Sequence, residues 1–459
     1  MRIKPLWAAL LALGITGAQA ADLLQAWQAA RQHDPDMAVA QAALQAGQAR
    51  REQASALWRP TVAATAAGGA MGSQTSTAGA SFSAPGMGTS SDVGFNTSVD
   101  NSLGARASIG ARMPLYSPER TAQGRKLTLS ADLAGVQWQA AEQALMLQTA
   151  ERYFAVALAD DALRLLRRQQ VAVNKALVEA QDRFQLGDAP VTDTHEAAAR
   201  ARAIEAQVLA AEVDLQIAQR ALADTTGWPA DALQVAPAPA LSAVPALPDL
   251  QEWLGQAEAH NPGLRQQALA VEVARQDVAQ YARGAGTTVD LVAQASREHL
   301  SGSGRYGHGS NTAQQHLVGV QITVPLYTGG QRGAREQELL HLQAKAEAEL
   351  DRTRQQVAQQ TRAAWLRLQA GQARTGAQDA ALRASQARLD ATQLGRQVGD
   401  RTTLDLLNAQ NDAAGAELAL AQLRTSLTLE RLRLLALAGQ LDERALHAAT
   451  IADPVRAAK

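Results

Sequence analysis

The sequence predicts an α+β fold with an internal duplication, in which long coiled-coil helices carry four β-strands per chain. Three observations predict it: two long segments without proline, four stretches of period-2 alternation, and a set of motifs that occurs once in each half. Aromatic residues make up only 3% of the chain and hydrophobic residues 46%. This composition favours long packed helices over a thick globular core and argues against a disordered chain.

The first 20 residues have the three regions of an export signal. Arg2 and Lys4 precede an apolar run over residues 6–15, and Ala18 and Ala20 have the small-x-small spacing of a cleavage site. The alternative is a short transmembrane anchor, but the run is too short for a hydrocarbon core of about 30 Å. We therefore predict cleavage after Ala20.

The remaining composition restricts the possible partners. No other stretch has the apolar length of a membrane helix, so an exported chain that spans a membrane is expected to do so as strands. The absence of cysteine excludes disulfides, thiolate metal sites and a lipidated N-terminus. Lys and Arg number 43 against 44 Asp and Glu, which leaves no electrostatic footprint for nucleic acid.

The repeat is visible in paired motifs. HDP ends at Pro35 and HNP at Pro262, RMPLYS (112–117) recurs as TVPLYTGG (323–330), and the glycine of one Gly-Asp turn, Gly187, matches Gly399. Such self-similarity predicts one architecture used twice. We expect a first repeat over 21–226, a proline-rich linker over 227–249, a second repeat over 250–439 and a tail over 440–459.

Each repeat contains one very long helix followed by a turn and a shorter helix. Residues 119–186 and 330–398 contain no proline. In the first of them, apolar residues recur with the steps of a coiled-coil seam at Leu147, Phe154, Leu158 and Leu165. A helix of about 65 residues is about 100 Å long. The two long helices are expected to end at the turn glycines, Gly187 and Gly399, and each following helix to open at a Thr or Asp cap.

Four alternating stretches predict strands, at about 61–72, 102–115, 287–299 and 315–326. Strands of about 10 to 13 residues are about 35 to 40 Å long, enough to cross a bilayer when tilted. The alternative is a soluble hairpin domain with one buried face. Since the smallest outer-membrane barrels have eight strands, several chains would have to share one barrel.

These residues and motifs resemble the TolC family of outer-membrane efflux proteins. The resemblance rests on HDP and HNP, on VPLYTGG before the second long helix, and on VGDRTTLDLLNAQ at its turn. It covers essentially the whole mature chain. Within the family, the turn motif is more similar to the type I secretion branch than to the lipid-anchored drug-efflux branch. The absence of a cysteine, which a lipid anchor needs, agrees with this.

The resemblance implies a homotrimer in the outer membrane of a Gram-negative bacterium. Three chains would form a 12-stranded β-barrel in contact with outer-membrane lipid and a 12-helix tunnel in the periplasm. The linker and the tail would form an equatorial belt. The implied partners are a periplasmic adaptor and an inner-membrane transporter, either an ABC exporter for type I secretion or a drug pump.

The resemblance also implies that the helical turns form a periplasmic entrance gate. Asp405 falls at the first of two acidic ring positions, whereas the second is Asn408. Arg401 matches a linking arginine, and its partners on the adjacent coil match Thr192 and Asp193. A further linking tyrosine of the family is replaced by Arg396. Three Asp405 carboxylates near one axis would attract cations.

Less specific interpretations remain open. A Gly-Asp-Arg turn can be only a helix cap with a solvated charge, and the whole chain could be a periplasmic or surface coiled-coil scaffold or adhesin without a channel. The histidines His299, His308 and His316 cluster in the second strand loop, where we expect exposed side chains and no metal site. The chain lacks a nucleophile elbow, an HExxH motif and a phosphate-binding glycine loop, so we expect neither an enzyme nor a cofactor.

Overall fold

The structure is a computed structural model and describes residues 22–188, 190–230, 233, 235–239, 248–282, 284–304 and 307–450. The predicted signal peptide, with Ala18 and Ala20, lies outside these ranges, as does the tail from residue 451. The helices are α1 Leu23–His33, α2 Pro35–Ala56, α3 Pro118–Gln185, α4 Val191–Thr226, α5 Leu250–His260, α6 Pro262–Tyr281, α7 Gln331–Gln397, α8 Thr403–Leu437 and α9 Glu443–Ala448. The strands are β1 Thr61–Ala84, β2 Gly88–Tyr116, β3 Thr288–Gly304 and β4 Gly307–Thr323.

The order of elements from α1 to α4 recurs from α5 to α8. The chain nevertheless forms two compact units that each combine both halves. The helical unit comprises residues 22–45, 134–268 and 348–450 of the described chain, and the strand unit comprises 46–133 and 269–347. The duplicated segments therefore pack with each other rather than separately.

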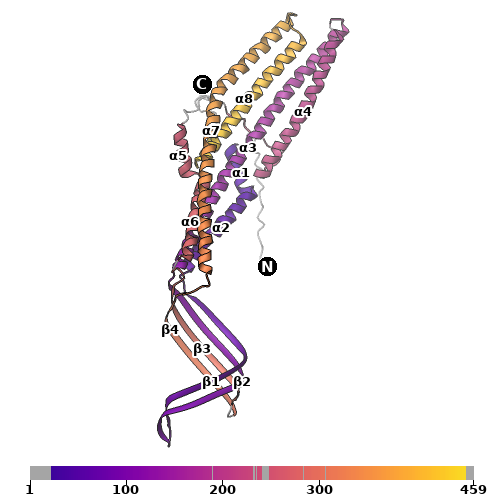
Figure 1. Cartoon of the computed structure of the whole chain (residues 1–459). Coiled ribbons are helices and arrows are strands. Elements are labelled where there is room, and N and C mark those ends of the chain that lie inside the picture. Colours follow the sequence, from indigo (N-terminus) through magenta and orange to yellow (C-terminus); the bar gives the residue numbers. More distant parts are fainter. Residues whose placement is uncertain are drawn as a thin grey trace, which may run out of the picture. The chain divides into compact units, whose positions relative to one another are not determined.

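The long helices have the predicted length and seam. Helix α3 has 68 residues and α7 has 67, and none of those residues after Pro118 is a proline that would remove a backbone hydrogen bond. Phe154 and Leu165 on α3 are buried, with Leu147 packed against the same core as Phe154. In the helical unit, α3–α4 and α7–α8 form two hairpins, each ending in its own turn (Figure 1).

The main core of the helical unit lies where α1 and α9, the first and last described helices, pack together with α3. Trp27 of α1, Tyr153 and Phe154 of α3, and Leu446 of α9 are almost fully buried in one cluster. Burial raises the pKa of the Tyr153 phenol to about 12, against a smaller opposing effect of the Ala236 backbone N–H that donates to its oxygen at 2.9 Å. Ala236 belongs to the predicted linker, so part of that linker is packed on the core.

The strand unit contains one antiparallel sheet in the order β1-β2-β3-β4. Strands β1 and β4 are its two edges. The strands are longer than predicted, because the hairpins close at Ala84–Gly88 and Gly304–Gly307. Beyond the last β2–β3 pair, Asp100–Ser303, β1 and β2 continue as a two-stranded ribbon (Figure 1). Register shifts after Met71 and Thr77 interrupt this ribbon.

The predicted loop histidines therefore lie on strands. His299 belongs to β3, and His308 and His316 belong to β4. His299 and His316 already fall at the ends of the predicted strands 287–299 and 315–326. The prediction placed the cluster in a loop because Gly and Ser residues surround His308, yet these residues continue the backbone pairing of the hairpin. Among the described residues, no three His, Asp or Glu side chains are grouped so that they could hold a metal ion.

The two faces of the sheet differ in polarity. One face, called the apolar face below, presents Val62, Leu103, Ile109, Met113, Leu291, Val318, Val320 and Ile322, all of them exposed. The opposite face carries two ion pairs between β2 and β3, Arg112 with Asp290, and Arg106 with Glu298 at 3.9 Å.

No helix within the described ranges has the combined length and apolar character needed to cross a membrane.

Candidate functional site

The two hairpin turns of the helical unit share a left-handed glycine. Gly399 has φ +84° and Gly187 has φ +81°, a conformation that glycine adopts without a steric penalty. After each glycine the next amide N–H donates to a carbonyl five residues earlier, Asp400 to Gly395 and Asp188 to Arg183, both at 2.8 Å. Both turns are thus Schellman caps, which satisfy the last carbonyls of α3 and α7.

The helices that follow the two turns open differently. Thr402 is the N-cap of α8, and its hydroxyl accepts a hydrogen bond from the Asp405 amide at 3.1 Å. In the first half the N-cap of α4 is Pro190, which makes no side-chain cap bond. The prediction of a Thr or Asp cap is therefore confirmed for α8 and wrong for α4, where the helix begins before Thr192 and Asp193. Those two residues lie in its first turn.

Asp405 is held in place by the α8 cap. One oxygen of its carboxylate, Oδ2, accepts from the Thr402 amide at 3.0 Å and from the Thr402 hydroxyl at 2.9 Å. The pKa of Asp405 is lowered, chiefly by the hydrogen bond from the Thr402 backbone N–H and next by that from the Thr402 hydroxyl. The charges of Arg401 and Arg388 lower it further. Asp405 is therefore ionised at neutral pH, and Oδ1 is not used by the cap.

Arg401 folds back over its own hairpin. Its Cγ lies 2.8 Å from the point that a Cβ on Gly395 would occupy, so the glycine leaves room for the arginine stem. The structure of one chain contains no contact between Arg401 and its predicted partners, Thr192 and Asp193, among the described interactions. The expected link joins neighbouring chains, and it stays a prediction.

Arg396 and Asn408, the two positions that differ from the family pattern, both connect the hairpins within one chain. Arg396 Nη2 of α7 donates to both carboxylate oxygens of Glu179 on α3, at 2.7 and 3.0 Å. Arg200 of α4 donates to the amide oxygen of Asn408 on α8 at 3.0 Å. Glu179 and Arg200 were missed from the sequence, where the only available signal was a charge in an alanine-rich helix.

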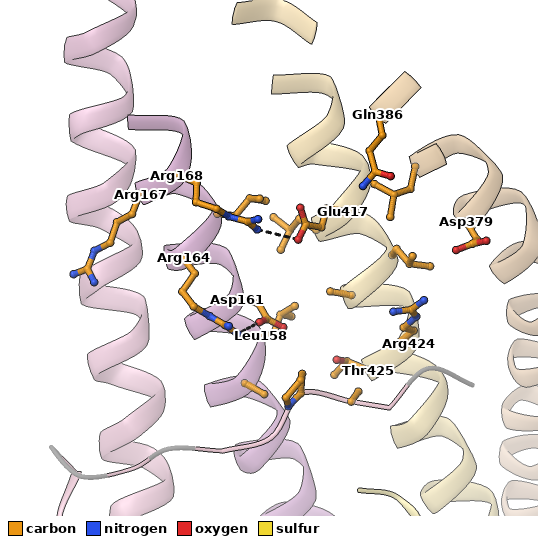
Figure 2. A pocket seen from close by; sticks show the side chains of 18 of the residues that line it. Leu158, Asp161, Arg164, Arg167, Arg168, Asp379, Gln386, Glu417, Arg424 and Thr425 are labelled. Atoms are coloured by element: carbon orange, nitrogen blue, oxygen red, sulfur yellow. Dashed lines mark hydrogen bonds and ion pairs between the residues drawn. The ribbon is translucent and has the colours of Figure 1, made fainter. Parts of the chain in front are cut away.

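Further from the turns, α3 and α8 border a groove with a volume of about 1040 Å³. Arg168 of α3 pairs with Glu417 of α8 at 2.9 Å across it (Figure 2). Burial raises the pKa of Asp161 in spite of the neighbouring Arg164. Arg424 points into the same groove, and its buried Nε has no hydrogen-bond partner among the described residues. The groove is thus charged, and the Arg168 pair is a third connection between the hairpins.

The comparison with protein families decides the class of the chain. The model described as "Outer membrane efflux protein" matches residues 26–228 and 253–440, that is, both halves. The chain belongs to this family. The match leaves out the linker between α4 and α5, and it includes both hairpin turns and all four strands.

Individual relatives agree with the family. The outer membrane protein TolC of Escherichia coli is 28% identical over 334 residues, which cover 71% of this chain and 68% of TolC. The protease secretion protein PrtF of Dickeya chrysanthemi is 27% identical over 441 residues, 94% of this chain and 91% of PrtF. Among solved structures, the outer membrane protein VceC of Vibrio cholerae has a TM-score of 0.70 at 20% identity, covering 92% of this chain and 97% of VceC.

The resemblance inferred from the sequence motifs is therefore confirmed, and the chain is an outer-membrane protein with the fold of these channels. The family is one of channel and transport proteins. The roles of the individual gate residues stay predictions.

Proposed function

We propose that three copies of this chain form an export duct across the outer membrane and the periplasm. The observation that carries the proposal is the sheet, which has two free edges and one exposed apolar face. The opposite face carries the ion pairs of Arg106 and Arg112. An apolar face toward lipid and a polar face toward a lumen are the pattern of outer-membrane barrels. Edge β1 of one chain would pair with edge β4 of the next, which removes both edges.

The helices supply the second part of the duct. A helix of 68 residues is about 100 Å long, which exceeds what a bilayer requires and suits a passage through the periplasm. The proposed partners are a periplasmic adaptor and an inner-membrane transporter. The near-complete match to a protease secretion protein favours an ABC exporter of type I secretion over a drug pump as the transporter.

A fractionation experiment tests the duct. We expect the full-length protein in outer-membrane fractions as a heat-modifiable trimer, and we expect the extracted trimer to form ion-conducting channels in planar bilayers. Release of the protein by osmotic shock, or a trimer that conducts no ions, would contradict the proposal and favour a scaffold or adhesin.

Asp405 is proposed to line the periplasmic entrance of this duct. Threefold symmetry would place three ionised carboxylates near one axis, with Oδ1 of each available to a cation. Arg200 donates to Asn408 at the position of a second acidic ring. This entrance would therefore have a single acidic ring.

A pair of substitutions separates the charge of Asp405 from its cap. Asp405→Asn keeps an oxygen for Thr402 but removes the charge, so the concentration of a multivalent cation that blocks the channel should rise by about tenfold or more. Thr402→Ala keeps the charge and weakens the cap, which should cost about 1 kcal/mol of helix stability and leave the block in place. Planar-bilayer recordings measure the block, and equal block in the wild type and Asp405→Asn would remove Asp405 from the entrance.

The lowered pKa of Asp405 also predicts the pH dependence of the block. A carboxylate with a lowered folded-state pKa stays ionised at and below the ordinary aspartate value of about 3.9. The cap and the negative ring are therefore present throughout the neutral range. In the proposed trimer, repulsion between the three Asp405 carboxylates raises this pKa relative to the single chain. Block is therefore expected at full strength at pH 7 and should weaken as the pH falls toward the pKa of the ring.

A further inference from the structure

On β3 and β4, the side chains of the apolar face change from apolar to polar at the same height along the two paired strands. On β3 the apolar residues are followed by Arg297 and His299, and on β4, read toward its start, they are followed by His316, Gln314 and Thr312. Direct backbone pairing joins Arg297 to Gln314 and His299 to Thr312. Since directly paired residues share a face of the sheet, these five polar side chains form one cluster, called the basic cluster below.

The basic cluster carries positive charge and has no acidic neighbour on its face among the described side chains. Arg297 is charged at every relevant pH, and its side chain and those of His299 and His316 are exposed. His299 Nδ1 lies 2.9 Å from the Thr312 hydroxyl, which fixes the ring. The acidic residues of β3, Asp290 and Glu298, belong to the opposite face, where they pair with arginines.

Two depressions open beside the basic cluster on the same sheet. One has a volume of about 550 Å³ and is bordered by Arg297, Gln314 and His316, and the other, of about 410 Å³, is bordered by Arg297 and His299. Alanine side chains of β1 and β2, among them Ala66 and Ala107, line both. Arg297 thus stands between two hollows with an apolar lining.

The position of the cluster along the strand corresponds to a membrane surface. From the first residue of β3, Thr288, to Arg297 the strand rises about 30 Å. At the tilt typical of such barrels this is about 23 Å along the membrane normal, close to the height of their apolar band. The basic cluster would therefore lie at the headgroups of the leaflet opposite to the one at which β3 begins.

We propose that the basic cluster binds the phosphate-bearing headgroup of an outer-leaflet lipid, with an acyl chain in the alanine-lined hollows. The inference rests on the proposed membrane-spanning role of the sheet. Arg297 would donate two parallel hydrogen bonds to the phosphate, a geometry that guanidinium groups favour. His299, Gln314 and His316 would donate from either side. A lipid is the favoured source of the phosphate because the site is continuous with the apolar face.

The test is a lipid titration of the detergent-extracted full-length protein, followed by native mass spectrometry. The probe is bisphosphorylated lipid A, and phosphatidylcholine is the comparison lipid. Arg297→Gln should weaken the apparent affinity for lipid A by about tenfold, since a hydrogen bond to a charged group is lost. The matched control is Arg112→Gln, which removes the same charge from the opposite face, outside the lining of both hollows. It should leave the affinity for lipid A within about twofold of the wild type.

The outcomes separate the possible explanations. Equal affinity of Arg297→Gln and the wild type for lipid A would overturn the proposal, as would equal weakening by Arg297→Gln and Arg112→Gln. Displacement of lipid A by millimolar inorganic phosphate alone would identify a general anion site and contradict the lipid assignment. Channel formation by the unaltered protein in bilayers of phosphatidylcholine alone reports on the proposed duct, so a failure of either proposal is seen independently.

Discussion

Reversing the charge of Arg396 is expected to raise the single-channel conductance several-fold, and exchanging the charges of Arg396 and Glu179 is expected to restore it. Arg396→Glu replaces an attraction across 2.7 Å by two facing carboxylates on α3 and α7. Both side chains are partly exposed, and a solvent-accessible ion pair contributes about 1 kcal/mol, so its loss in three chains would amount to about 3 kcal/mol. A shift of that size changes a closed-to-open equilibrium about a hundredfold.

The control for this prediction is an ion pair within one hairpin. Arg388 of α7 pairs with Asp412 of α8 at 2.6 Å, so Arg388→Glu breaks a similar pair without separating the hairpins. Planar-bilayer recordings should show wild-type conductance for Arg388→Glu and for the double variant Glu179→Arg with Arg396→Glu. If Arg388→Glu and Arg396→Glu open the channel equally, the connection between α3 and α7 is not part of the gate.

The gate residues show which part of the site can be predicted from the local sequence and which part depends on contacts between distant segments. The Schellman glycine and the Thr402 cap depend on neighbours within a few residues, and both follow from the local motif. The partner of Arg396 is Glu179, which lies 217 residues away in the sequence. Helix α3 contains other acidic residues close to Glu179 in the sequence, such as Asp182. Only the packing of the two hairpins selects Glu179, because it determines which helix faces meet.

The same distinction explains the strands. Alternation was visible where the sheet has one apolar and one polar face, as between Leu103 and Met113. Beyond the Asp100–Ser303 pair, β1 and β2 pair only with each other among the described residues, so neither face needs apolar side chains and the alternation disappears. The Gly, Ser and Thr residues there then read as a loop although their backbone is paired. Strand ends are thus least predictable where a strand leaves the sheet.

The proposed gate and the proposed lipid site place different demands on the chain. The pair of Arg168 with Glu417 is exposed and the pair of Arg396 with Glu179 is partly exposed, so each is weak and the proposed adaptor could break them together. Arg297 instead stands on a strand paired on both sides. A weak connection between hairpins suits a moving part, and a rigid sheet suits a fixed position in the membrane.

Replacing Gly439 by alanine is expected to destabilise the protein more than the same replacement at Gly227 or Gly187. Gly439 follows α8 with φ +68°, and an added Cβ would lie 2.4 Å from the backbone oxygen of His260. The left-handed conformation alone costs about 1 to 2 kcal/mol. The backbone of α5 must also move, which would disturb the bond from the buried Asn261 amide to the Leu437 oxygen. A total of about 3 to 4 kcal/mol is expected.

Two other glycines provide graded controls for Gly439. Gly227 ends α4 with φ +73°, but an added Cβ there would meet the side-chain ring of His33 at 2.8 Å, and a ring can rotate away. Gly187 has the same left-handed conformation with nothing within 4 Å. Thermal unfolding of the extracted protein, followed by circular dichroism at one heating rate, should therefore rank the midpoints with Gly439→Ala lowest, Gly227→Ala next and Gly187→Ala nearest to the wild type. Equal midpoints for the three variants would mean that the left-handed conformation alone sets the cost, and that α5 yields to the added methyl group without loss of stability.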